Sequence, residues 1–230
     1  MKFLTALSTV VILSLTVSCS QQEKAPEASQ EMEEVSMSYS RLPDSLTGIS
    51  FKNVLKEDQT INYFTYEYMY MGGGVAIGDI NNDGLADIYL TGNRVENKLY
   101  LNKGNMQFED ISRKAGVQGD DRWYTGVNMV DVNNDGLLDI YLSVSGKFTT
   151  TDNQLFINNG NLKFTEEAAA YGLNYPGPSV QSAFFDYDND GDLDLYLANY
   201  PPTSFGSPNE HFFEKMKDPT PAETDRLLRN

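Results

Sequence analysis

The sequence contains a single cysteine and a single histidine among its 230 residues. One cysteine cannot form a disulfide within the chain, so covalent cross-links are excluded as a source of stability. Nucleophilic catalysis of the Ser-His or Cys-His kind needs a histidine held beside its nucleophile, and one copy of each residue gives no such pair to expect. Zinc, which prefers His and Cys ligands, is not favoured either.

Basic residues are also scarce. Lys and Arg number 17 against 33 Asp and Glu, which gives a formal net charge of −16. Such a chain lacks the positive surface that binds nucleic acid, and it has no electrostatic attraction to anionic lipid. Its plentiful carboxylates leave catalysis by an acid pair open in principle.

The one mostly apolar stretch long enough to resemble a targeting segment lies at the amino terminus, over residues 3–17. It is too short and too rich in Ser and Thr for a membrane span, and its position is that of a secretory signal, residues 1–18. Cys19 follows a small residue and resembles the cysteine that bacterial lipoproteins lipidate, although Thr16 departs from the usual Leu. We expect a lipid anchor in the cell envelope, at the outer membrane or cell surface, or a secreted protein if Cys19 is not lipidated.

The next segment, residues 19–47, is polar and acidic and has no sustained apolar periodicity. Such a composition cannot bury enough apolar surface to order itself and predicts a flexible tether. The folded domain is therefore expected over residues 48–230.

Three copies of one acidic loop are present, at residues 79–87, 131–139 and 186–194. Each carries oxygen-bearing side chains at positions 1, 3, 5 and 9, a glycine at position 6 for a sharp turn, and a backbone carbonyl available at position 7. Flexible all-oxygen coordination favours Ca²⁺, so about three calcium ions are expected. The expected ligands are Asp79, Asn81, Asp83, Leu85, Asp87, Asp131, Asn133, Asp135, Leu137, Asp139, Asp186, Asp188, Asp190, Asp192 and Asp194.

An EF-hand shares the start of this pattern but requires a Glu at position 12 and flanking helices. Position 12 is instead Leu90, Leu142 or Leu197, and each loop runs into a short Ile-Tyr-Leu or Leu-Tyr-Leu run typical of a buried strand. The pattern therefore predicts strand-loop-strand calcium sites, whose ions would also offset part of the net charge.

The similarity between the copies extends beyond the loops. Their first residues lie 52 and 55 positions apart, from Asp79 to Asp131 and from Asp131 to Asp186. Each period holds four short strand patterns, a to d, with the acidic loop between a and b, and residues 51–54 fit a lone strand d before the first period. Four antiparallel strands per period of this length predict a β-propeller blade, whereas a calcium-binding β-solenoid uses much shorter repeats.

The pattern Gly-Val-Ala-Ile-Gly-Asp-Ile-Asn-Asn-Asp-Gly-Leu-Ala-Asp-Ile-Tyr resembles the FG-GAP or VCBS repeat of integrin α-subunit propellers and bacterial surface proteins. With the amino-terminal signal, the chain is similar to bacterial lipoproteins of the cartilage acidic protein (ASPIC/UnbV) type. This resemblance implies an all-β fold in which four-stranded blades form part of a seven-bladed propeller, with metal in the a–b loops. Because residues 227–230 repeat the start of strand c, we expect an amino-terminal fragment of a longer propeller protein.

The function expected from these features is non-catalytic capture of an extracellular or periplasmic glycan, peptide or protein. A propeller-based polysaccharide-active enzyme and a calcium-stiffened spacer are the alternatives. Successive turns of a blade lie at opposite ends, so the b–c loops, including an inserted loop at residues 200–221, and the d–a links share the end away from calcium. The expected ligand contacts there are Arg122, Trp123, Tyr124, Phe212 and Phe213, although large aromatics fill cores as readily as interfaces.

Overall fold

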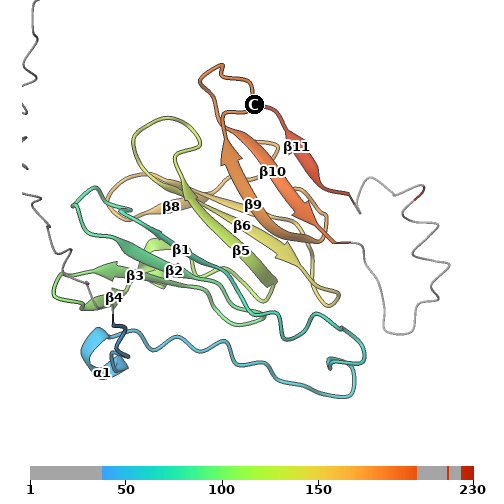
Figure 1. Cartoon of the computed structure of the whole chain (residues 1–230), viewed down its shortest axis with the longest axis horizontal. Helices are drawn as coiled ribbons and strands as arrows, with labels where there is room; N and C mark the ends of the chain where they lie inside the picture. Colours follow the sequence, from blue (N-terminus) through green and yellow to red (C-terminus); the bar gives the residue numbers. More distant parts are fainter. Residues whose placement is uncertain (1–37, 201–216, 218–223) are drawn as a thin grey trace, which may run out of the picture. The chain divides into compact units, whose positions relative to one another are not determined.

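Short runs of aromatic and β-branched residues, separated by turn-forming loops, give this chain eleven strands in its described part. The computed structural model describes residues 38–200, 217 and 224–230 (Figure 1). Of a first unit, residues 1–40, only 38–40 are described, and they have no regular structure. The second unit, residues 41–230, contains all the strands.

The strands form three antiparallel sheets, and within each sheet neighbours in sequence are neighbours in space. The first sheet consists of β1 (Val75–Gly78), β2 (Asp87–Leu90), β3 (Lys98–Asn102) and β4 (Phe108–Asp110). The second consists of β5 (Trp123–Val130), β6 (Asp139–Ser145), β7 (Gln154–Asn158) and β8 (Phe164–Glu166). The third consists of β9 (Ser179–Phe185), β10 (Asp194–Asn199) and β11 (Arg226–Leu228).

The described helices are single turns, α1 (Asp44–Thr47) and α2 (Ser112–Ala115). Within the described residues, no helix reaches the length and apolarity needed to cross a membrane. The predicted all-β class and the four-stranded unit are confirmed.

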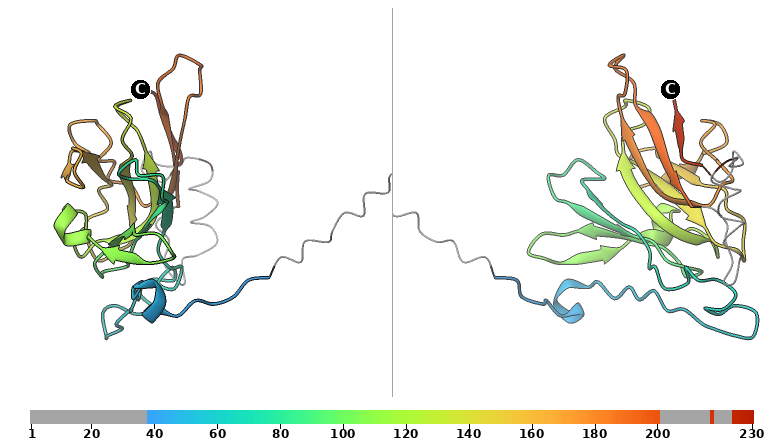
Figure 2. Two further views of the ribbon diagram at one scale, coloured as in Figure 1. Left: turned by 90° about the vertical axis from the view of Figure 1, so that its left-hand side faces the viewer. Right: turned by 45° about the vertical axis from the view of Figure 1, so that its right-hand side comes forward.

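The first strands of successive sheets lie beside one another, β1 against β5 and β5 against β9. Figures 1 and 2 show the sheets succeeding one another around these strands. Innermost first strands with the other strands following outward are the arrangement of propeller blades. The fold is therefore part of a β-propeller.

Apolar side chains fill the spaces between neighbouring sheets. Tyr89 and Leu99 of the first sheet belong to one buried cluster with Val127 and Ile140 of the second. A second cluster joins β6 and β7 to β9 and β10, and in it the Tyr141 ring lies edge-on to that of Phe184, with 5.3 Å between the ring centroids. Each sheet thus buries one face against the next, which makes the clusters the main hydrophobic contribution to the stacking of the blades.

The first sheet also presents an apolar face that no described residue covers fully. Val75 is 61% exposed, whereas Val127 and Ser182, which occupy the same position in the second and third sheets, are each 3% exposed. Ile77, on the same face of β1, is 66% exposed. In the second and third sheets, the preceding sheet therefore buries the residue at this position of the repeat.

The lone strand expected at residues 51–54 is absent, which corrects that prediction. No described strand forms a ladder with the segment. Side chains hold it instead: the Ser50 N–H donates to Tyr100 Oη at 3.2 Å, and the Asn53 amide donates to Asn93 Oδ1 at 2.7 Å. The Asn93 N–H in turn donates to Asn53 Oδ1 at 3.0 Å, so a side-chain pair replaces strand pairing.

Candidate functional site

The three acidic loops adopt one backbone conformation. The fourth residue of each is an asparagine in the left-handed region, Asn82, Asn134 or Asn189, with φ of 57°, 58° and 60°. The sixth is Gly84, Gly136 or Gly191, with φ of 84°, 85° and 97°. Asn and Gly are the residues that adopt this conformation most readily, so the loop sequence itself dictates the turn.

The first aspartate of each loop accepts two hydrogen bonds from the turn. Asp79 Oδ1 accepts the Asp83 N–H at 3.0 Å, and Asp79 Oδ2 accepts the Gly84 N–H at 2.7 Å. Asp131 and Asp186 accept the equivalent pairs at 2.8–3.0 Å and 3.1–3.2 Å. Desolvation raises the pKa of Asp79, but the backbone N–H donors outweigh it, so the pKa lies below its ordinary value.

The ninth aspartate joins each loop to strand c. Asp87, Asp139 and Asp194 are buried, with exposures of 0%, 0% and 2%. One oxygen of Asp139 accepts the Val132 N–H at 3.1 Å, and the other accepts the Asn158 N–H of β7 at 2.8 Å. Asp87 and Asp194 make the same two bonds. Burial raises the pKa of Asp87 and Asp139, although these N–H donors oppose the rise.

In the third loop, carboxylate oxygens of Asp186, Asp188 and Asp194 all lie within 4.8 Å of one another. Asp188 Oδ1 is buried and has no hydrogen-bond partner in the described part of the chain. These carboxylates form an all-oxygen set of ligand atoms, one of which is a buried acceptor without a hydrogen bond, and such a set fits a hard cation. The first two loops have Asn at this third position, so their equivalent group contains only two acids.

Arg229 adds a cation to the third loop. Its Nη2 lies 2.7 Å from Asp188 Oδ2 and 3.3 Å from Asp190 Oδ2. The equivalent residues of the first two sheets, Leu101 and Ile157, are apolar and 6% exposed. The arginine thus forms ion pairs with the loop that contains the most carboxylates.

The fifth and seventh residues interact alike in every loop. The N–H of Leu85 donates to Asp83 Oδ1 at 2.9 Å, and Leu137 and Asp192 donate to Asp135 and Asp190 at 2.8 and 3.1 Å. These bonds orient the fifth carboxylate within the turn. The expected roles of all fifteen loop residues as calcium ligands remain predictions.

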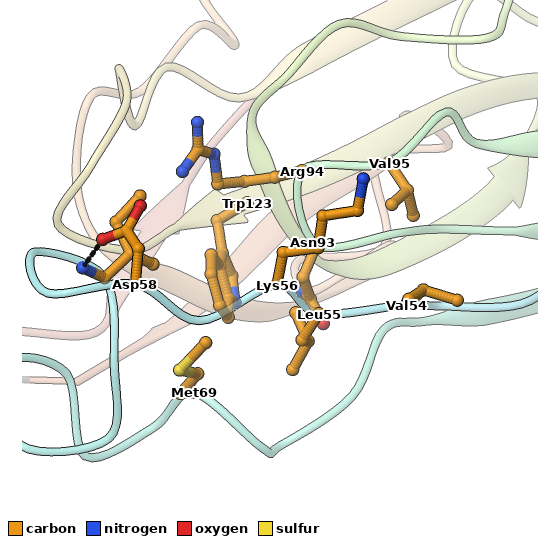
Figure 3. Close-up of a pocket in the computed structure, with 10 residues that line it drawn as sticks. Val54, Leu55, Lys56, Asp58, Met69, Asn93, Arg94, Val95 and Trp123 are labelled. Atoms are coloured by element: carbon orange, nitrogen blue, oxygen red, sulfur yellow. Dashed lines mark hydrogen bonds between the residues drawn. The ribbon is translucent and has the colours of Figure 1, made fainter.

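A pocket of about 320 Å³ lies at the opposite end of the sheets (Figure 3). Its walls come from the link that precedes β1, from the β2–β3 connection, and from Trp123 at the start of β5. These are a d–a link and a b–c loop, the elements in which ligand contacts were expected.

The structure corrects the expected exposure of Trp123 and Tyr124. They are 2% and 0% exposed, because β5 begins at Trp123 and includes both residues in the sheet. Within the core, Tyr124 Oη donates a hydrogen bond to Gln154 Oε1 at 2.7 Å. Arg122 is partly exposed and pairs with Asp120 at 3.2 Å, whereas Phe212 and Phe213 lie outside the described residues.

Trp123 belongs to an aromatic cluster that joins the link preceding β1, here called the amino-terminal link, to the sheets. Its ring lies 5.1 Å from that of Tyr66 and 6.3 Å from that of Phe148. Tyr66 Oη is 2.6 Å from Tyr200 Oη, which also accepts from Ser145 Oγ at 2.8 Å. Tyr66 and Trp123, which are 1% and 2% exposed, therefore belong to the core and not to an exposed ligand surface.

Sequence reasoning missed Lys56 and Arg94, which line the pocket. Both resemble ordinary surface cations, and no spacing or motif distinguishes them. Only folding brings residue 56 to the connection that contains residue 94.

Comparison with known proteins supports the repeat assignment. A family model described as FG-GAP-like repeat matches residues 79–142 and 143–197. The chain is 33% identical to cartilage acidic protein 1 of Xenopus tropicalis over 134 residues, which are 56% of this chain and 20% of that protein. It is 30% identical to the proteins of the same name from Homo sapiens, over 134 residues, and Mus musculus, over 131 residues, with the same coverage. The chain thus spans about a fifth of the length of these relatives.

The two family matches are consecutive and contain 64 and 55 residues, together 119 of the 230. The first match begins at the first acidic loop and ends within β6, the second strand of the second sheet. The second match begins within β6 and ends within β10, the second strand of the third sheet. Their spacing is that of the stacked sheets described above. The chain belongs to the FG-GAP-like repeat family.

Proposed function

We propose that this FG-GAP repeat domain, a binding or structural module, is a calcium-stabilised binding module that captures its ligand without catalysis. The observation that supports calcium is the third loop, where three carboxylates converge around a buried, unpartnered oxygen and the backbone repeats that of the other two loops. Several carboxylates held together repel one another, and a bound dication relieves this repulsion only in the folded state. The ion would therefore stabilise the fold.

Calcium titration of the full chain after chelation tests the metal sites. We expect uptake of about three ions, and loss of about one ion in each of Asp83→Ala, Asp135→Ala and Asp190→Ala. Asp121→Ala removes an exposed carboxylate outside the loops and serves as the matched control. A chain that takes up no calcium, or that melts at the same temperature with and without chelator, would contradict the proposal.

A binding role, rather than a purely structural one, is supported by the pocket at the end opposite the acidic loops. Loops on a rigid scaffold commonly carry recognition, and here the strands fix both the link before β1 and the β2–β3 connection. The proposed partner is a glycan, peptide or protein outside the cytoplasm.

The proposed location is the cell envelope, with Cys19 lipidated and the domain held at the outer membrane or cell surface. This proposal rests on the sequence, since residue 19 lies outside the described residues. We expect labelled palmitate to be incorporated into the wild-type chain in bacterial cells and to be absent from Cys19→Ser, which should leave the membrane fraction. Membrane retention of Cys19→Ser would contradict lipid anchoring through this residue.

A further inference from the structure

The pocket of Figure 3 has an apolar floor and a cationic side. In that view the Arg94 side chain lies above the Trp123 ring and Met69 lies below it, while Lys56 and Leu55 lie beside the ring. Trp123 and Met69 are 2% and 1% exposed, so they form a fixed wall of the core and offer a ligand little surface. The apolar surface that a ligand can reach comes from Val54, which is 52% exposed, and from the partly exposed Leu55 and Val95.

The pocket is lined by two bases, Lys56 and Arg94, and by one acid, Asp58, whose pKa is lowered by the Ile61 and Thr60 N–H donors and by the charge of Arg94. Within the described residues, neither Lys56 nor Arg94 has a side-chain hydrogen bond or ion pair. Asp58 Oδ1 accepts the N–H groups of Thr60 and Ile61, each at 2.7 Å, and Glu57 accepts the Tyr70 hydroxyl. In a chain with net charge −16, a pocket lined by two cations and one carboxylate is locally positive, which favours an anionic ligand.

The backbone at Arg94 adds a second observation. Its φ is +58°, in the left-handed region, where most of the other non-glycine residues of this chain are asparagines. A long side chain is disfavoured there, so the conformation must be imposed by its surroundings. The Arg94 N–H donates to the Arg122 carbonyl at 3.0 Å, which fixes the connection across to β5. Strain of this kind collects at binding and catalytic sites.

We propose that the pocket binds a carboxylate-bearing sugar, a uronic acid residue of an acidic polysaccharide. This inference rests on the proposed binding function and names its ligand class. Arg94 and Lys56 would hold the carboxylate by charge-assisted hydrogen bonds, for which the planar arginine fork is well suited. The CH groups of the sugar ring would lie on the exposed apolar lining, Val54, Leu55 and Val95.

The shape of the pocket favours a sugar ring over an acidic peptide. Its volume of about 320 Å³ is near the lower end of ligand pockets, which suits one ring rather than a long chain. A peptide bound as an added strand needs a free strand edge, and the pocket walls are loops apart from the single bridge between Asn93 and Trp123.

Trp123 is the only tryptophan of the chain, so its fluorescence reports on this pocket directly. The full chain, loaded with calcium, is titrated with D-glucuronate, with D-glucose as the neutral control and N-acetylaspartate amide as the peptide-like acid. We expect a saturable change in fluorescence with glucuronate, and affinities at least about tenfold weaker for the two controls, because glucose lacks the charge-assisted bonds and the peptide-like acid lacks the ring.

Lys56→Gln and Arg94→Gln should each weaken glucuronate binding about tenfold, and added salt should weaken it in the wild type. Lys52→Gln removes an exposed cation of the same segment that does not line this pocket, and it should bind like the wild type. Melting curves establish whether each variant is folded. If Arg94→Gln does not fold, Lys56→Gln alone still tests the role of the cations.

Three results would overturn the inference: no saturable response to glucuronate, equal binding of glucose, or equal or tighter binding of N-acetylaspartate amide. If glucuronate gives no saturable response but calcium uptake is normal, the ligand class is rejected and the calcium sites are retained. Absence of calcium uptake rejects the proposed function itself, so the two failures are distinguishable.

Discussion

Replacing Trp123 with alanine is expected to lower the free energy of unfolding by about 3–5 kcal/mol. The side chain is 2% exposed and packs between Tyr66 of the amino-terminal link and Phe148 beyond β6. Its removal would leave a cavity that these rings cannot fill without breaking the contact between Tyr66 and Tyr200. Urea unfolding at saturating calcium measures the change.

Two further variants sharpen this prediction. Trp123→Phe keeps an aromatic ring in the cluster and should recover part of the lost stability. Phe64→Ala truncates an aromatic of the same link that is 77% exposed and should change stability by less than about 0.5 kcal/mol. If Trp123→Ala unfolds at the wild-type urea concentration, the aromatic cluster does not hold the link to the sheets.

Replacing Asp139 with alanine is expected to destabilise the fold even without calcium, by about 2–4 kcal/mol. Its two oxygens accept the Val132 and Asn158 N–H groups in a fully buried site. Alanine would leave the buried Asn158 donor and the partly buried Val132 donor unsatisfied, and a buried group of this kind costs about 1–3 kcal/mol. Unfolding in the presence of a chelator isolates this structural contribution from metal binding.

Asp135→Ala is the matched control, because Asp135 belongs to the same loop but is exposed. Its carboxylate accepts the Leu137 N–H at 2.8 Å, a bond that water can replace. In chelator its loss should cost less than about 1 kcal/mol, although both variants should lose calcium at this loop. Equal destabilisation by the two variants would show that Asp139 has no separate structural role.

Much of this protein could be predicted from short stretches of sequence. The acidic loops require Asn and Gly at the positions where the backbone turns left-handed, so their conformation is decided within nine residues. Strand order in the first two sheets follows from short connections, which join antiparallel neighbours, whereas β10 and β11 of the third sheet are far apart in the sequence. The repeat length then predicts blades, because four short strands recur with each loop.

Other features depended on which residues, distant in sequence, cover one another. Trp123 and Tyr124 follow a charged turn and looked exposed, but β5 begins at Trp123, and Tyr66, more than fifty residues earlier, packs against that tryptophan. Residues 51–54 have a strand-like pattern but no strand beside them to pair with, so they bond through side chains.

The sequence by itself determined the loops, the strands and the repeat, since turn conformation and strand alternation are set by neighbouring residues. The tertiary structure decided which aromatics are buried, that Arg229 lies on the third loop, and that Lys56 and Arg94 share a pocket. Those outcomes depend on burial and charge between segments that meet only when the chain folds. No local pattern in the chain encodes such a meeting, because the residues concerned lie far apart in the sequence.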